Sequence, residues 1–341
     1  MESRGQIGII ACSSGKPFAE KILAHLKEIT KKEGKTNGIA LIDSKEMHFA
    51  NSEVKTEINE SIRGRDIFIV QDVENSVAPY SVNDNIFALI SAAETARASG
   101  ASHITAVIPV FPYARQDKSI AREGIMAGVV ARQLQAVGVD RIITLDVHNE
   151  AIAGHFNSAR FENLHASKNI MDFVREKIGL KNLVVLSPDL GGARRANHYA
   201  KTLGAGLAMM HKKRDYSKVN EVEEVTLLGD VRGKRVLIVD DMIDTAGTAV
   251  KTIRTLKKQH NPEEIHFACS LPLLNGEAKK LLSDAHSEGV LNSVIGTDAV
   301  YHGGDEFLRQ SPWYSEVSVA KYFARVIFNV NCHMPVSDLL K

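Results

Sequence analysis

The densest group of chemistry-bearing residues follows a buried strand that we predict in the second half of the chain. The segment reads Arg235-Val-Leu-Ile-Val-Asp-Asp-Met-Ile-Asp-Thr-Ala-Gly-Thr-Ala249, an apolar run that leads into three carboxylates and a Thr/Gly turn. In an open α/β sheet, ligands bind beyond the carboxyl ends of the strands, and the start of the next helix offers N–H groups to a phosphate. We therefore predict a phosphate cradle made of Asp244, Thr245, Ala246, Gly247 and Thr248.

The two adjacent carboxylates of this segment suit a ligand that carries hydroxyl groups. Asp240 and Asp241 can accept hydrogen bonds from a sugar, or bind a hydrated divalent cation through its waters. Gly247 permits close approach of the backbone to a ligand. The alternative interpretation is structural, with Asp and Thr capping a helix and Gly making an ordinary turn. A complete apolar strand followed by this acidic, Thr-rich turn favours the ligand site.

Three more apolar runs end in polar clusters. Arg115-Gln-Asp117 follows the first, Asp146-Val-His148 ends the second, and Asp189-Leu-Gly-Gly192 ends the third. A planar guanidinium can donate two hydrogen bonds to phosphate oxygens. Imidazole nitrogen and carboxylate oxygen are both possible metal ligands, although Mg²⁺ usually keeps several waters. A lone Arg is more often a surface residue and a lone His a structural one, so these assignments depend on the clusters occurring together.

The elements that must position these groups are short apolar runs separated by helical patterns. The runs are rich in Ile and Val and mostly do not alternate with polar residues, as in strands that are buried on both faces. They are Ile7–Ala11, Ile39–Ile42, Ile67–Val70, Ile104–Pro109, Ile142–Val147, Leu183–Leu186, Val236–Val239 and Ile265–Cys269. Between several of them, apolar residues recur at helical spacing, as in Val82, Ile86 and Leu89. Alternating strands and helices predict parallel α/β layers.

Composition is that of a globular chain with no overall affinity for nucleic acid. The 341 residues suggest two domains at roughly 150 residues each. Lys and Arg number 42 against 41 Asp and Glu, which argues against non-specific nucleic-acid binding. The 3 Cys residues are far apart and form no Cys-x-x-Cys pair, so neither a disulfide framework nor a structural zinc site is indicated. No apolar run of about 18 residues occurs, so we expect no membrane span. The amino terminus has only a short, glycine-interrupted apolar stretch from Ile7 to Cys12, so we expect no signal peptide, and the cysteine pattern suggests a reducing cytoplasm.

Together, the four ordered motifs resemble the ribose-phosphate pyrophosphokinase family, whose product is phosphoribosyl diphosphate (PRPP). The resemblance extends from about Phe49 to about Gln259 and includes the segment Asn59-Glu-Ser-Ile-Arg-Gly-Arg-Asp-Ile-Phe-Ile-Val-Gln71. It implies transfer of the terminal diphosphate of ATP to the anomeric oxygen of ribose 5-phosphate, with Mg²⁺ as cofactor and AMP as the second product. It also implies a homo-oligomer built of dimers, up to a hexamer.

The resemblance further implies two type I phosphoribosyltransferase-like domains, each with a mainly parallel sheet flanked by helices. We place the ATP-side domain at residues 1–165 and the ribose 5-phosphate domain at 166–319. A helix over 320–341 is expected to pack back on the first domain.

Specific roles also follow from the resemblance. The ribose 5-phosphate site would comprise Asp189, Asp240, Asp241 and the 244–248 loop. The ATP site would comprise Phe49, Asn51, Glu53, Arg115, Gln116, Asp117 and His148. Metal binding would involve Asp146, His148 and Asp189, and the catalytic pair would be Lys212 and Arg214 in the segment His211-Lys-Lys-Arg214.

The chain departs from the family pattern mainly in residues around the proposed catalytic and metal-binding side chains, which are themselves retained. Asn51 stands where the family usually has Asp, Pro112 where it has Gly, Asn149 where it has a small residue, and Asp215 where it has Pro. The departures at Asn51, Pro112 and Asp215 support one alternative, a non-catalytic regulatory subunit that assembles with an active paralogue. A second alternative, a phosphoribosyltransferase that consumes PRPP, depends on the Asp240–Thr248 loop alone.

Overall fold

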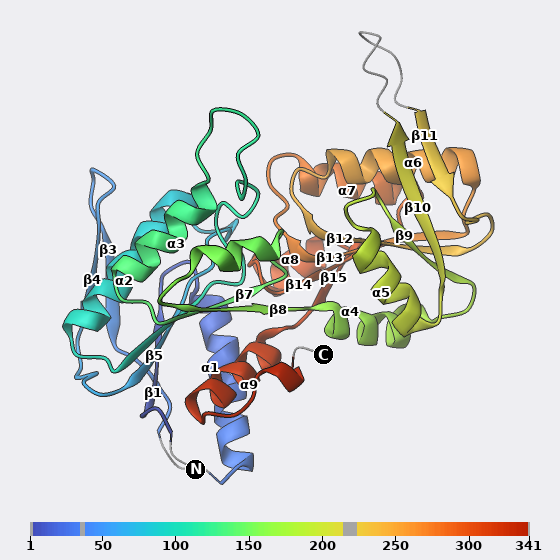
Figure 1. Cartoon of the computed structure of the whole chain (residues 1–341). Helices are drawn as coiled ribbons and strands as arrows, with labels where there is room; N and C mark the ends of the chain where they lie inside the picture. Colours follow the sequence, from blue (N-terminus) through green and yellow to red (C-terminus); the bar gives the residue numbers. More distant parts are fainter. Residues whose placement is uncertain (1–2, 35–37, 214–223, 340–341) are drawn as a thin grey trace. The chain divides into compact units, whose positions relative to one another are not determined.

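The computed structural model describes residues 3–34, 38–213 and 224–339 and divides the chain into two units (Figure 1). Unit 1 consists of Met1–His165, Asp298–His302 and Ser318–Lys341, and unit 2 consists of Ala166–Thr297 and Gly303–Val317. Each unit contains its own mainly parallel sheet flanked by helices, so the predicted α/β fold class is confirmed. Within the described ranges, no helix is long and apolar enough to cross a membrane.

The sheet of unit 1 has six parallel strands in the order β2-β1-β5-β6-β7-β8. Its strands are β1 (Ile7–Ala11), β2 (Ala40–Leu41), β5 (Asp66–Val70), β6 (His103–Val107), β7 (Arg141–Leu145) and β8 (Arg160–Leu164). The helices of this unit are α1 (Lys16–Lys32), α2 (Val82–Ala98), α3 (Met126–Ala136) and α9 (Ala320–Asn331), with 3₁₀ turns at Glu150–His155 and Ser337–Leu339. An antiparallel hairpin of β3 (Ser44–His48) and β4 (Val54–Ile58) lies beside α2.

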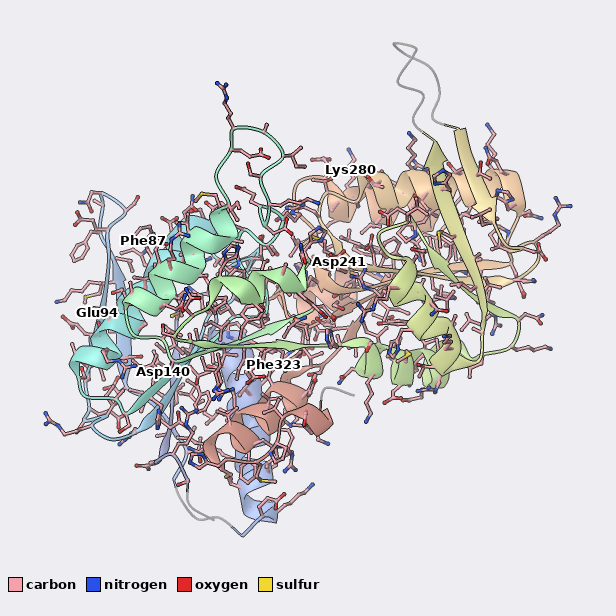
Figure 2. The ribbon with its side chains drawn as sticks, viewed as in Figure 1. Phe87, Glu94, Asp140, Asp241, Lys280 and Phe323 are labelled. Carbon is pink, nitrogen blue, oxygen red and sulfur yellow. The ribbon has the colours of Figure 1, made fainter. Side chains whose placement is uncertain are left out.

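Helix α9 completes unit 1 from the far end of the sequence. The rings of Phe323 on α9 and Phe18 on α1 meet edge to face at 5.2 Å between centroids (Phe323 is labelled in Figure 2). At the end of α9, the Asn331 side-chain amide donates to the carboxylate of Asp66 at 3.0 Å. The helix ends at Asn331 rather than continuing to 341 as the sequence suggested. Residues from the carboxyl-terminal region therefore form part of the core beside α1.

The sheet of unit 2 has seven strands in the order β11-β10-β9-β12-β13-β14-β15, parallel except for the β10–β11 pair. The strands are β9 (Leu183–Ser187), β10 (Gly206–Lys213), β11 (Glu224–Leu228), β12 (Arg235–Ile243), β13 (Glu264–Pro272), β14 (Ser293–Thr297) and β15 (Tyr314–Val317). The helices are α4 (Ser167–Phe173), a π-helical turn (Val174–Ile178), α5 (Ala193–Leu203), α6 (Gly247–His260), α7 (Ala278–Ser287) and α8 (Asp305–Gln310).

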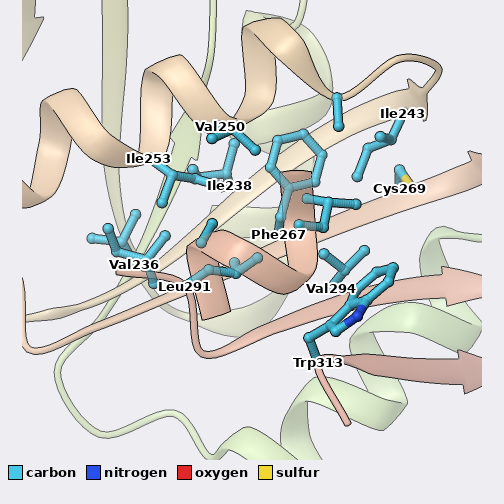
Figure 3. Close-up of a cluster of buried hydrophobic side chains, with 14 of the residues drawn as sticks. Val236, Ile238, Ile243, Val250, Ile253, Phe267, Cys269, Leu291, Val294 and Trp313 are labelled. Carbon is cyan, nitrogen blue, oxygen red and sulfur yellow. The ribbon is translucent and has the colours of Figure 1, made fainter. Parts of the chain in front are cut away.

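The core of unit 2 forms between this sheet and its helices (Figure 3). Ile238 of β12 and Phe267 of β13 pack with Val250 and Ile253 of α6, and the Trp313 side chain, only 2% exposed, fills the far part of the cluster. Burial of large apolar side chains of this kind supplies the main driving force for folding. The core holds β12 and α6 firmly, and with them the loop that joins the two.

All eight apolar runs predicted as strands lie in the two parallel sheets. One boundary differs in a way that affects the site. Asp240 and Asp241 lie inside β12 rather than beyond its end, because β12 continues to pair with β13 as far as Ile243 and Pro272. The carboxylate pair is therefore held by the hydrogen-bonded sheet rather than by a loop.

Candidate active site

The site residues predicted in unit 2 lie on two neighbouring parallel strands and the loops that follow them. Strands β9 and β12 pair in register, with Leu186 opposite Ile238. Because the carboxyl ends of parallel strands meet at one edge of a sheet, the segments 188–192 and 240–248 emerge side by side. Asp241, labelled in Figure 2, marks this edge.

An arginine of α5 contacts the carboxylate pair. Arg195 Nη1 lies 3.1 Å from Asp240 Oδ1 and 3.8 Å from Asp241 Oδ1. Asp240 Oδ1 also accepts a hydrogen bond from the backbone N–H of Asp241 at 2.9 Å, and Asp241 Oδ1 accepts one from Met242 N at 3.0 Å. Burial, and then the adjacent Asp241, raise the pKa of Asp240 to about 7, while Arg195 lowers it. Arg195 thus favours the ionised pair, which can accept hydrogen bonds from ligand hydroxyls.

The predicted phosphate cradle lies at the start of α6. Ala246 occupies the N-cap position in the left-handed conformation at φ 61°, and its methyl side chain cannot hydrogen-bond to the first N–H groups. The first turn contains no acidic residue, and a Cβ on the exposed Gly247 would meet no atom within 4 Å. Asp244 is held from outside the loop, because Asn275 Nδ2 donates to its carboxylate at 3.0 Å. An open, uncapped helix start of this kind suits an anion.

Asp189 begins the tight turn that joins β9 to α5. Its Oδ1 accepts a hydrogen bond from Gly192 N at 2.9 Å, and its carbonyl accepts one from Ser187 Oγ at 2.7 Å. A Cβ on Gly192 would lie only 2.8 Å from Ser187 Oγ, so a larger residue there would displace the Ser187 hydroxyl. The turn leaves the Asp189 side chain exposed to solvent.

In unit 1, the predicted metal-binding residues after β7 have different environments. His148 is exposed, whereas Asp146, at φ 39°, has its Oδ1 2.9 Å from His165 Nδ1. Burial and, less strongly, the charge of Asp146 raise the pKa of the nearby Tyr322 to about 12. The Asp146 carboxylate is therefore turned toward groups of its own unit.

The segment that contains Arg115 is braced on two sides. Tyr113, at φ 58°, donates its hydroxyl to Asn83 Oδ1 of α2 at 2.5 Å. On the other side, the Asn149 amide donates to the carboxylate of Asp117. Between these two contacts, Arg115 and Gln116 are exposed. Their side chains therefore reach solvent at the carboxyl end of β6.

The residues predicted to bind adenine form the tip of the β3–β4 hairpin. The backbone closes the tip through Phe49 N to Glu53 O at 2.9 Å, and Ser52 adopts φ 69°. Asn51 Oδ1 accepts a hydrogen bond from Glu53 N at 3.2 Å. Phe49 is 50% exposed, so part of this aromatic residue is accessible to a ligand.

A metal site formed by protein side chains alone does not appear among the described residues, where no group of three or more His, Cys, Asp or Glu side chains could hold an ion. The predicted metal-binding residues are divided, with Asp146 and His148 in unit 1 and Asp189 in unit 2. Mg²⁺ in phosphoryl-transfer sites is commonly bound by one or two carboxylates together with waters and substrate phosphates. The exposed carboxylate of Asp189 fits that mode.

The predicted catalytic pair is only partly within the described residues. Lys212 belongs to β10, where its backbone is opposite Val225 of β11. Arg214 lies outside the described residues, and so does Asp215.

Sequence reasoning missed Arg195 and Asn275, each of which contacts a predicted site residue. A signal for Arg195 was present: Arg194 and Arg195 occupy the first turn of α5, where the helix dipole disfavours cations. A carboxylate nearby offsets that cost. Asn275 follows β13 without any such pattern, and only the fold brings it to Asp244.

Comparison with known proteins agrees with this architecture. Residues 7–138 match the N-terminal domain of ribose phosphate pyrophosphokinase, and residues 160–302 match the phosphoribosyl transferase domain. The chain is thus a two-unit protein of the phosphoribosyltransferase class. It belongs to the ribose-phosphate pyrophosphokinase family, as the sequence motifs predicted.

Individual relatives extend over nearly the whole chain. The Campylobacter jejuni ribose-phosphate pyrophosphokinase is 36% identical over 92% of this chain and 95% of its own length. The Helicobacter pylori enzyme of the same name is 37% identical over 85% of this chain and 86% of its own. The crystal structure of phosphoribosylpyrophosphate synthetase from Mycobacterium smegmatis superposes with a TM-score of 0.82 at 28% identity, covering 95% of this chain and 98% of that one.

Proposed function

We propose that this chain is an ATP-dependent ribose-phosphate diphosphokinase of nucleotide biosynthesis. The reaction breaks the bond between the α and β phosphates of ATP and joins the released diphosphoryl group to the anomeric oxygen of ribose 5-phosphate. The products are PRPP and AMP, and the anomeric hydroxyl loses its proton. The observation that carries the proposal is similarity to ribose-phosphate pyrophosphokinases over more than nine-tenths of the chain, as in the relative aligned over 92% of it.

Ribose 5-phosphate would bind along the edge of unit 2 formed by β12 and α6. The 5-phosphate would lie on the first turn of α6, against the N–H groups and hydroxyls of residues 244–248. Asp240 and Asp241 would accept hydrogen bonds from the ribose hydroxyls, and Arg195 supports this role by favouring their ionised forms. Open space above Gly247 and the uncapped helix start support this placement.

ATP would bind to residues of the amino-terminal domain, 1–165, while ribose 5-phosphate binds to the domain 166–319. We assign the adenine to the hairpin tip with Phe49, Asn51 and Glu53, and the triphosphate to Arg115, Gln116, Asp117 and His148. The half-exposed Phe49 ring offers a stacking face, and the braced Arg115 segment offers donors for phosphate oxygens.

Mg²⁺ is the expected cofactor, and we propose that Asp189 and His148 lie beside it. Bound Mg²⁺ would neutralise part of the polyphosphate charge. The pairing of Asp146 with His165 makes Asp146 the weakest of the three predicted ligands. Lys212 and Arg214 would add positive charge where the diphosphoryl group is transferred, because positioning and charge stabilisation supply most of the rate in such reactions.

We further propose a homo-oligomer in which the adenine-binding hairpin reaches a neighbouring subunit's site, and a cytoplasmic location. The exposed aromatic ring of Phe49 at the hairpin tip supports the first point. The thiols of Cys12, Cys269 and Cys332 are buried and not disulfide-bonded, which agrees with a reducing compartment.

The test is to incubate the purified protein with ATP, ribose 5-phosphate and Mg²⁺ and to measure both products. Equal amounts of AMP and PRPP are expected. Absence of both, across a range of phosphate and divalent-metal concentrations, would favour the non-catalytic regulatory subunit. Consumption of PRPP with a nucleobase, without AMP formation, would favour a phosphoribosyltransferase.

A further inference from the structure

The β3–β4 hairpin that carries the proposed adenine site forms a two-stranded sheet of its own, separate from the six-stranded sheet of unit 1. Its last paired residues before the tip are His48 and Val54. A two-stranded hairpin alone is marginally stable in water, so its position depends on the elements that it packs against. Strand β4 lies on α2, where Thr56 N donates to Ser91 Oγ at 3.0 Å (Figure 1). The contacts of β3, the strand that leads into the tip, are different.

Two polar side chains hold β3 to the body of unit 1. Glu46 and His48 are two positions apart on the strand, so they project from the same face. Both side chains are largely buried, at 6% and 15% exposed respectively. Glu46 Oε2 accepts a hydrogen bond from Ser13 N at 3.0 Å, in the loop between β1 and α1. After burial itself, the charge of Glu46 is the second cause that raises the pKa of the neighbouring Cys12 thiol. Glu46 thus reaches from the hairpin to the carboxyl end of β1.

The imidazole of His48 is held on two sides. Its Nε2 lies 2.7 Å from Glu46 Oε1, and its ring stacks on the ring of Tyr80 with 3.8 Å between centroids and 10° between planes. An ionised carboxylate can only accept hydrogen bonds, so Nε2 is the nitrogen that carries the proton. Tyr80 lies outside the hairpin, just before the N-cap of α2. The stack therefore joins β3 to the segment that leads into α2.

The place of His48 in the strand connects this contact to the ligand site. Phe49 and Glu53 follow the His48–Val54 pair directly and close the tip through Phe49 N to Glu53 O at 2.9 Å. Each residue of the backbone has only two soft dihedral angles, so a shift of His48 is passed on to Phe49. The contacts of His48 therefore determine where the tip lies.

We propose that His48, held by Glu46 and Tyr80, is a positioning residue for the adenine of ATP. It fixes the hairpin tip where Phe49 meets the base. This inference rests on the proposed function and goes beyond it, because it assigns affinity for the base, as distinct from the triphosphate, to residues that act through the tip.

Two substitutions remove these contacts, and two controls leave them in place. His48→Ala removes both the hydrogen bond and the stack, whereas Tyr80→Ala removes the stack from outside the hairpin. Tyr80→Phe keeps an aromatic ring for stacking. Lys45→Ala changes an exposed side chain on the opposite face of β3. If His48 only stabilised the fold, its loss would lower the thermal midpoint without changing the preference for one ligand over another.

The measurement is calorimetric affinity for ATP and for inorganic tripolyphosphate, which has the phosphate chain but no base. We expect His48→Ala to weaken ATP binding about tenfold, as for the loss of a hydrogen bond to a charged group. Tyr80→Ala should weaken it about threefold, as for the loss of an aromatic pair. The two controls, and the affinity of every variant for tripolyphosphate, should stay within about twofold of wild type. Unchanged ATP affinity in both alanine variants would overturn the proposal, and so would an equal loss for the two ligands.

Turnover and assembly give further readouts. The KM for ATP should rise in His48→Ala, while kcat and the KM for ribose 5-phosphate stay close to wild type. Sedimentation of the variants should match that of wild type, and a loss of ATP affinity confined to variants that dissociate would overturn the proposal. Calorimetry needs no turnover, so the two proposals can fail separately. A wild type that binds ATP but forms no AMP counts against the reaction, not against the role of His48.

Discussion

Arg195 Nη1 lies 3.1 Å from Asp240 Oδ1, and this contact joins the first turn of α5 to the carboxyl end of β12. The two elements carry different parts of the proposed site, since the turn before α5 contains Asp189 and β12 leads into the phosphate cradle. The guanidinium also offsets the repulsion between Asp240 and Asp241. Arg195 therefore lowers the pKa of Asp240, although burial and Asp241 still raise that pKa to about 7.

Replacing Arg195 should affect sugar binding more than turnover. Arg195→Gln removes the cation, raises the pKa of Asp240 further and weakens its hydrogen bonds to ribose hydroxyls. We expect the KM for ribose 5-phosphate to rise about tenfold, a modest effect because the pair is partly exposed and screened by solvent. Arg194→Gln is the matched control, since Arg194 is exposed in the same turn. Equal KM values in the two variants would contradict the assigned role.

A substitution in the phosphate cradle at the start of α6 should disturb ligand binding without disturbing folding. Gly247→Ala meets no atom within 4 Å and should leave the thermal midpoint unchanged or slightly higher. The added methyl group occupies the space where the 5-phosphate is proposed to bind, so the KM for ribose 5-phosphate should rise on the order of tenfold to a hundredfold. Gly154→Ala, also in open space, is the control and should not change that KM. A normal KM in Gly247→Ala would place the phosphate elsewhere.

Lys212 can be tested against its neighbour in β10. If it stabilises charge during transfer, Lys212→Ala should lower kcat on the order of a hundredfold to a thousandfold, as for other groups with this role. Lys213→Ala, for which the sequence predicts no role, should retain most of its activity. Both are measured by the formation of AMP and PRPP. Equal activity of Lys212→Ala and wild type would exclude the catalytic assignment while leaving the overall reaction possible.

The buried carboxyl group of Asp72 should make the stability of unit 1 depend on pH. Its carboxylate is fully buried and accepts hydrogen bonds from Tyr301 N at 2.8 Å and Glu74 N at 3.1 Å, and burial raises its pKa to about 7. A carboxyl group whose pKa is raised by folding contributes stability below its ordinary pKa, and that contribution is lost as pH rises through about 7. Asp72→Asn cannot ionise, so its thermal midpoint relative to wild type should increase between about pH 5 and pH 8.

The control for this measurement is a carboxylate with the opposite shift. Hydrogen bonds from Ser81 lower the pKa of Asp84 in the capping box of α2. Asp84 is therefore ionised throughout that pH range, and the midpoint difference between Asp84→Asn and wild type should be flat. A flat difference for Asp72→Asn as well would mean that Asp72 is ionised in the folded protein at every pH tested.

Strand positions were the part of the fold that the sequence specified best. Runs such as Ile67–Val70 are apolar at every position because β5 is covered on both faces. The β3–β4 hairpin was not predicted, because Lys45 and Glu46 make its strands resemble a polar loop. Similarly, nothing in the periodicity of α9 indicates that it packs on α1, since an apolar helical face does not specify its partner.

In the candidate site, as in the fold, some features could be predicted from the sequence and others could not. Asp240, Asp241 and the 244–248 loop could be predicted, because their position at the carboxyl end of a buried strand and just after it places them at a sheet edge. The contacts of Arg195 and Asn149 could not, because each joins segments that are far apart in sequence. Asp146 combines both cases: its place after β7 was predictable, but its pairing with His165 depends on how β8 ends beside β7.

Unit 1 contains residues from both ends of the chain, and this affects how the protein folds while it is being synthesised. Domains generally fold in order from the amino terminus as they leave the ribosome. Here the apolar face of α1, with Phe18 and Ile22, cannot be fully covered until α9 has been synthesised. Unit 2 can be complete once Val317 has emerged, so the amino-terminal unit is the last to mature. Ribosome-bound chains that stop before residue 318 should therefore present an unfinished first unit to chaperones and proteases.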